Sequence, residues 1–278
     1  MGNQSGAMVR QWAMALLLAA VGQAGMLGSV QAMSLDTTSA TPNDGVLQNF
    51  TGINWNGNGA GWVQGFDLTG ANTTGDTDTF TVTYQAFAGS IQSTSPTPNL
   101  YVASPGSATG GYELTTLQFA NETATCMNLG CSSVSLALNS GSWSVWFDSA
   151  PDANQATGTG FTDGVLILAG MWGAGSGTFS GTTGNSTLNG LVNFFDAGYF
   201  PTGPLLTNLQ MNSLDYPGLG PPLFTRPASI NGVSTGPDTA TDFIVQVDPL
   251  QRFSVPEPST LALAVIGILA MGRGFRRA

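Results

Sequence analysis

The amino-acid sequence predicts an all-β body, a β-sandwich or jelly roll, between two terminal segments of a different character. Apolar and polar residues alternate at several places in the body, as they do along half-buried strands. Clusters rich in Gly, Asn and Ser separate these places and predict turns. Helical periodicity of any length occurs only in the two terminal segments. Many short strands at roughly ten-residue spacing are typical of a sandwich or a jelly roll.

Residues 1–32 are predicted to be a helical signal peptide that is removed after export. Arg10 precedes the apolar run 12–21, and small residues stand at the two positions that a cut after Ala32 requires. The apolar run is too short to span a bilayer. A cut after Ala24 and an uncleaved anchor are the alternatives.

The expected exported body, residues 33–254, is strongly acidic. The whole chain carries 6 Lys+Arg against 16 Asp+Glu, and it has no His. All six basic residues are arginines, and between the two terminal segments Arg226 and Arg252 face fifteen acids, a net charge of −13. Without His and Lys, histidine bases, histidine metal ligands, Schiff-base lysines and P-loops are excluded. We also expect no nucleic-acid partner, because phosphates need basic neutralisation.

Several short segments of the body are predicted to be strands. The segment 79–84 alternates strictly, with Phe80, Val82 and Tyr84 on one face. Polar clusters at 139–141 and 181–186 are interpreted as turns. The other predicted strands are 134–138, 143–147, 165–169, 187–195 and 243–247.

A proline-rich stretch, residues 199–238, interrupts this pattern. Only 205–211 within it has the composition of a strand. Because proline cannot donate to a sheet ladder, we expect a long ordered loop, or one edge strand flanked by loops.

The two cysteines, Cys126 and Cys131, are predicted to form a disulfide, because the chain is expected to be exported. So short a loop contributes only about 2 kcal/mol of stability. A redox or metal pair is the alternative, but it lacks the two-residue gap typical of such pairs.

Carboxylates in polar loops are candidate calcium ligands. Asp76 and Asp78 follow a Gly/Asn/Thr loop, and calcium takes several oxygen ligands from such loops. The alternative is a solvated turn, and no cofactor other than calcium is expected. Glu113 and Glu122 are the only glutamates of the body, and paired carboxylates could serve glycoside hydrolysis. The chain offers no His or Lys to support them, so we expect no enzyme.

Trp55 and Trp62 flank a loop of Gly and Asn residues. Exposed indole rings stack on sugar faces, and Asn side chains bond hydroxyls, so the two rings are candidate glycan contacts. The alternative, which we favour, is that both rings are buried in the core.

The C-terminal segment, residues 255–278, has three parts. It opens with Val255, Pro256, Glu257 and Pro258, an extended run because each proline fixes its own φ and disfavours helix in the residue before it. An uncharged run, 259–272, follows. As a transmembrane helix it would span about 21 Å of a hydrocarbon core of about 30 Å, which suits a temporary anchor. Three arginines then act as a cytoplasmic stop: Arg273, Arg276 and Arg277.

In this order of parts, the segment resembles the PEP-CTERM sorting signal of Gram-negative bacteria. The resemblance implies an exosortase as partner, cleavage near Pro256–Pro258, and a transient inner-membrane anchor. It also implies delivery to the cell surface or exopolysaccharide matrix. An ordinary C-terminal anchor is the alternative.

The segments 188–195 and 241–254, together with the proline-rich stretch between them, resemble flocculation-associated PEP-CTERM proteins. That resemblance implies a non-enzymatic protein of the biofilm or floc matrix. The alternatives are a secreted carbohydrate-binding or carbohydrate-active protein and a calcium-stabilised adhesin.

Overall fold

The structure is a computed structural model that describes residues 33–68, 73–93, 111–201, 203, 206–215 and 224–254. The predicted signal peptide and sorting helix lie outside these residues. Residues Ala32–Val255 form one compact unit. The described residues are all β and contain no helix, as predicted, so none of their segments could cross a membrane as a helix.

The strands of the described residues differ widely in length. Five of them have 13 to 16 residues, well beyond the spacing that the sequence suggested. In chain order the strands are β1 (Met33–Asp36), β2 (Val46–Phe50), β3 (Gly52–Trp55), β4 (Gly59–Gln64), β5 (Thr77–Gln92), β6 (Glu113–Cys126), β7 (Ser133–Asp148), β8 (Val165–Ser180), β9 (Thr183–Phe195), β10 (Leu206–Asp215), β11 (Ser229–Ile230), β12 (Val233–Ser234) and β13 (Phe243–Ser254).

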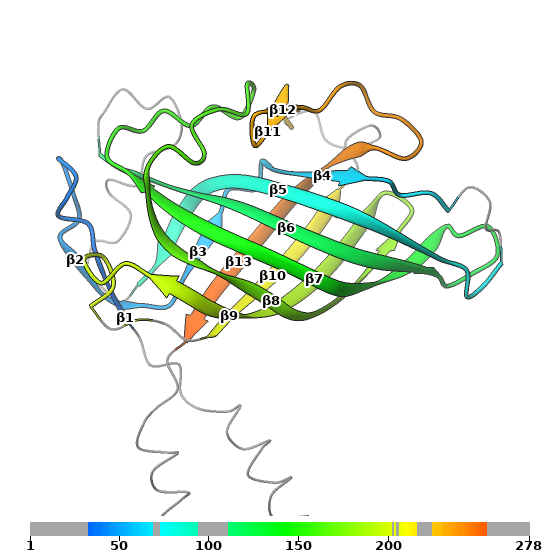
Figure 1. The fold of residues 1–278 in the computed structure, drawn as a ribbon, viewed down its shortest axis with the longest axis horizontal. Helices are drawn as coiled ribbons and strands as arrows, with labels where there is room; N and C mark the ends of the chain where they lie inside the picture. Colours follow the sequence, from blue (N-terminus) through cyan, green and yellow to red (C-terminus); the bar gives the residue numbers. More distant parts are fainter. Residues whose placement is uncertain are drawn as a thin grey trace, which may run out of the picture. The chain divides into compact units, whose positions relative to one another are not determined.

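The main sheet closes on itself into an antiparallel barrel. Its order is β10-β9-β8-β7-β6-β5-β3-β13-β4, and β10 also pairs with β13. The short strands β3 and β4 share one position in the ring, since both pair with β5 on one side and β13 on the other. Figure 1 shows the long neighbouring strands β5 to β9 of this eight-position ring.

The predicted sandwich or jelly roll is therefore wrong, although the all-β class is confirmed. Alternation of apolar and polar residues shows that one face of a strand is buried. It does not show whether that face meets a second sheet or the interior of a closed one.

The polar cluster 139–141 is not a turn. The predicted strands 134–138 and 143–147 are parts of one strand, β7, and the cluster lies at a bulge, where the register with β6 shifts between Asn121 and Glu122. A bulge places one extra residue in the strand and restores the alternation beyond it.

The proline-rich stretch contains a central strand rather than an edge strand. β10 pairs with β9 over Leu206–Asp215 and with β13 over the same residues, and these pairs close the ring. The prolines of the stretch lie outside β10, so every residue of the strand keeps its N–H for one of the two ladders.

The interior is filled with aromatic rings over part of its length. Phe50 contacts Phe200 and Phe253 at centroid distances of 5.6 and 5.8 Å, and Trp143 contacts Trp172 at 5.7 Å. The hairpin of β1 and β2 adds its apolar side chains to the same core. Outside the ring, residues 149–164 cover part of β5 and β6, and residues 224–235 cover part of β4, β5 and β13.

Candidate functional site

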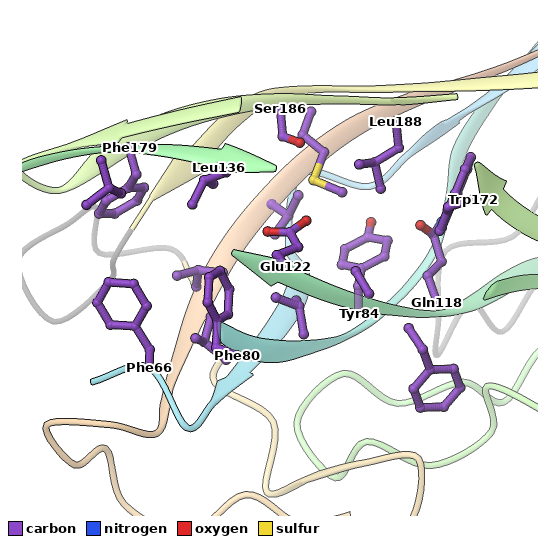
Figure 2. Close-up of a pocket in the computed structure, with 18 of the residues that line it drawn as sticks. Phe66, Phe80, Tyr84, Gln118, Glu122, Leu136, Trp172, Phe179, Ser186 and Leu188 are labelled. Carbon is purple, nitrogen blue, oxygen red and sulfur yellow. The ribbon is translucent and has the colours of Figure 1, made fainter. Parts of the chain in front are cut away.

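The remaining interior of the closed sheet contains a cavity of about 110 Å³. Side chains of β4 to β10 and of β13 line it, and most of them are aliphatic or aromatic (Figure 2). Phe66, Phe179 and Phe243 border the cavity and are only half-buried, so they mark its more open side.

Alternation along β5 and β6 brings polar groups into this cavity. Phe80, Val82 and Tyr84 all line it, as predicted from the strict alternation of 79–84. On β6, Glu122 pairs with Phe80 and Gln118 pairs with Tyr84, so both side chains point to the same interior. In Figure 2 the oxygen atoms of Glu122, Tyr84 and Gln118 are directed into the cavity.

The carboxyl of Glu122 is the only acidic group among the described residues that line the cavity. The residue is 7% exposed, and it has no hydrogen-bond partner among the described residues. Burial raises the pKa of Glu122 to about 7, because the ionised form loses its hydration. The carboxyl therefore changes charge near neutral pH.

Three more polar atoms at the cavity lack partners within the described part of the chain: the Tyr84 hydroxyl, Gln118 Oε1 and Trp172 Nε1. The Nε2 of Gln118 donates to the Thr116 Oγ1 at 3.2 Å, which fixes the amide and leaves its oxygen toward the cavity. Burial, with a contribution from the Asp248 carboxylate, raises the pKa of Tyr84, so this hydroxyl stays protonated.

The position of the Trp172 ring depends on glycines that face it. A Cβ on Gly190 would lie 2.7 Å from the ring, and a Cβ on Gly141 would lie 2.9 Å from it. Any larger residue at these two places would push the indole away from its position beside the cavity.

A second polar cluster lies outside the ring, where residues 149–164 cover β6. Carboxylate oxygens of Glu113, Asp148 and Asp152 lie within 4.8 Å of one another. Glu113 is fully buried and accepts hydrogen bonds from the backbone N–H groups of Asp152 (3.2 Å) and Ala153 (3.1 Å). Burial raises the pKa of Glu113 to about 7, and the two neighbouring aspartates add to the rise.

The two glutamates lie on opposite sides of the sheet. Glu113 faces the covering residues 149–164, whereas Glu122, an odd number of positions further along β6, faces the cavity. They therefore cannot flank one glycosidic bond as a catalytic pair.

The candidate calcium ligands Asp76 and Asp78 hold separate backbone segments. Asp76 accepts hydrogen bonds from the N–H and the hydroxyl of Thr73, which lower its pKa, and Asp78 accepts one from the Asp67 N–H. Among the described residues, neither belongs to a group of three or more candidate metal ligands.

The two candidate glycan-contacting rings are buried. Trp55 is 1% exposed, and its Nε1 donates to the Gln251 Oε1 at 3.1 Å. Trp62 is 9% exposed and packs with Ile230 and Ile244 outside the ring. Neither indole offers a free face to a sugar. The predicted disulfide is present between Cys126 and Cys131, where it bridges the β6–β7 turn.

Sequence reasoning missed the cavity and its polar atoms. Gln118, Ala120 and Glu122 alternate along β6 with outward residues, but their polarity suggests a solvated face. Their register with Phe80 and Tyr84 is what shows that they face the interior. That register is a property of the paired sheet, so a single segment of sequence does not reveal it.

The comparisons with known proteins concern the other end of the chain. Residues 254–278 match the PEP-CTERM protein-sorting motif. No curated protein matches the chain, and neither does any solved structure. The sorting motif supports an exported protein that is held transiently in the membrane and sorted by an exosortase.

Proposed function

We propose that this protein is a non-enzymatic component of the exopolysaccharide matrix of a Gram-negative cell, in a biofilm or floc. The sorting motif at 254–278 carries the proposal, because it implies an exported protein that is released at the cell surface. The exosortase cleaves near Pro256–Pro258 and frees the body from its anchor.

The chemistry of the body supports a contact role rather than catalysis. The body's only two glutamates, Glu113 and Glu122, lie on opposite sides of the sheet, and the chain has no His or Lys. With a net charge of −13, the body repels anionic polymers at low salt and favours neutral glycans or cationic partners.

An exposed apolar stripe offers a surface for such contact. Met171, Leu191 and Leu206 are 51%, 55% and 42% exposed. Leu191 pairs with both of the others across β8, β9 and β10, so the three side chains form one patch. Exposed apolar patches of this kind are found where proteins contact other macromolecules.

Replacing Pro256, Glu257 and Pro258 by alanine tests the sorting step. The variant should stay in the membrane fraction and keep its C-terminal arginines, as measured by fractionation and mass spectrometry. Release of the variant at the normal rate would contradict the proposal.

A second variant, Leu191→Ser, tests the matrix role. It should be released normally but should wash out of isolated matrix more easily than the unchanged protein. Turnover of a neutral or acidic glycan by the purified protein would instead favour a carbohydrate-active enzyme.

A further inference from the structure

We propose that the cavity inside the closed sheet binds one small primary ammonium compound that carries an apolar group about the size of a benzene ring. This site is distinct from the matrix role above and does not depend on it.

The size of the ligand follows from the size of the cavity. The interior of an eight-stranded closed sheet is either filled by side chains or holds one small ligand. Here it is filled at one end by the rings around Phe50 and Trp143 and leaves about 110 Å³ beyond them. An engineered apolar cavity of about 150 Å³ holds one benzene molecule, so a single ring is the upper limit for this smaller cavity, and any substituent must be short.

The walls provide the apolar half of the recognition. Phe66 contacts Phe80 at 5.3 Å and Phe243 at 5.9 Å, in both cases edge to face, and Val82 and Leu188 complete the lining. Faces of aromatic rings also attract cations, so this lining tolerates an ammonium as well as a ring.

The unpartnered polar atoms provide the other half, and most of them are acceptors. The Gln118 Oε1 and the ionised carboxylate of Glu122 accept only, the Tyr84 hydroxyl accepts or donates, and the Trp172 Nε1 donates only. A primary ammonium donates up to three hydrogen bonds, whereas an alcohol donates one and a carboxylate none. Among common small polar groups, the ammonium satisfies these acceptors best.

Charge leads to the same ligand class. Neither basic residue of the described part lines the cavity, and Arg226 is paired with Asp238 outside it. The ionised carboxyl of Glu122 therefore has no protein counterion, and a buried charge is stable only when paired. The net charge of −13 also raises the local concentration of cations.

Few other titratable groups face Glu122. Within the described part of the chain, Tyr84 on β5 is the only other one that lines the cavity, and Asp248 on β13 is exposed and affects Tyr84. The lining residues from β4 and β7 to β10 carry no titratable side chain. Binding should therefore follow the ionisation of Glu122.

Calorimetric titration of the protein as the cell releases it tests the inference, with benzylamine, benzyl alcohol and benzoate as matched probes. Benzylamine should bind at one saturable site, about tenfold more tightly at pH 8 than at pH 6. A primary amine of this kind stays largely protonated over this range, as the lysine side chain with a pKa of about 10.4 does, while Glu122 loses its proton. Glu122→Gln should weaken benzylamine about tenfold or more, and Glu113→Gln, outside the ring, should leave it unchanged.

Three results would overturn the inference. One is the absence of saturable binding by benzylamine and by the shorter and longer amines butylamine and phenethylamine. Another is binding of benzyl alcohol or benzoate as tight as that of benzylamine, which would mark a general apolar or an anion-binding cavity. The third is undiminished binding to Ser186→Leu, whose larger side chain fills the cavity from β9, when near-ultraviolet circular dichroism shows that this variant is folded.

Discussion

Glu122 gives this protein a pH-dependent stability that a single isosteric substitution should remove. The pKa of its carboxyl is about 7 in the folded protein, because burial disfavours the ionised form, against a value of 4.5 without burial. Below pH 4.5 the carboxyl is protonated in both the folded and the unfolded state, and no stability is lost. Between pH 4.5 and about 7 the folded state keeps a proton that the unfolded state has released, so the free energy of unfolding falls as the pH rises.

The size of this loss follows from the shift in pKa. At about 1.4 kcal/mol per pKa unit, ionising Glu122 costs about 3 kcal/mol once the pH is above 7, and most of that arises between pH 5 and pH 8. Glu122→Gln keeps the shape of the side chain and cannot ionise. Relative to the unchanged protein, it should therefore gain about 2–3 kcal/mol of stability between pH 5 and pH 8.

Urea unfolding at pH 5, 6, 7 and 8, followed by tryptophan fluorescence with the disulfide intact, measures this gain. Glu113→Gln is the matched control, because its pKa is also about 7 but its carboxylate accepts two backbone N–H groups. The amide oxygen of that variant can still accept from these N–H groups, while its NH2 meets the Ala153 N–H on the other side, so the variant should also lose part of the pH slope but gain less stability than Glu122→Gln. The reasoning fails if Glu122→Gln keeps the pH slope of the unchanged protein, or is less stable than it at pH 8.

Three further predictions concern stability. Replacing Cys126 and Cys131 by serine should lower the free energy of unfolding by about 2 kcal/mol, because the bridge closes a very short loop. Denaturant unfolding measures this loss, and a loss twice as large would mean that the bridge also holds β6 and β7 together. A calcium chelator should leave the melting temperature unchanged, because backbone N–H groups already satisfy Glu113; a clear drop in scanning calorimetry would favour the calcium-stabilised adhesin. Gly190→Ala should destabilise the protein by about 1–3 kcal/mol, because its Cβ would lie 2.5 Å from the Met171 carbonyl oxygen and 2.7 Å from the Trp172 ring. An alanine at Gly181 meets no atom within 4 Å, so it should cost only the strain of its positive φ.

Local sequence signals predicted the strands well and their assembly poorly. The alternation of Phe80, Val82 and Tyr84 placed three residues correctly on the interior face, since the side-chain period of a strand is a local property. Closure of the ring depends on pairs such as Leu206 with Ser254, which lie far apart in the sequence and leave no periodic trace. For the same reason the bulge near Asn139 was interpreted as a turn, and the proline-rich stretch around β10 as a loop or an edge strand. A residue type reports local backbone preference and not the partner of a strand.

The candidate site was harder to predict because its polar residues lie on the interior face of a strand, where a strand pattern normally has apolar residues. A polar residue of a strand is normally assigned to the solvated face, yet Gln118 and Glu122 face the interior. Each buried polar group without a partner costs about 1–3 kcal/mol, so the cavity lowers the stability of the sheet. The Glu113 cluster shows the opposite arrangement, because backbone N–H groups complete it.

This contrast between satisfied and unsatisfied polar groups is the reason for assigning binding to the cavity. Proteins keep residues that conflict with the requirements of folding, such as buried polar groups without partners, chiefly where function requires them. An apolar side chain at Glu122 would fill the cavity and remove the cost of ionisation, so the carboxyl is poorly explained as a structural residue. A ligand that supplies donors and a positive charge would recover most of that cost, and its binding energy would then stabilise the folded protein in proportion to its concentration.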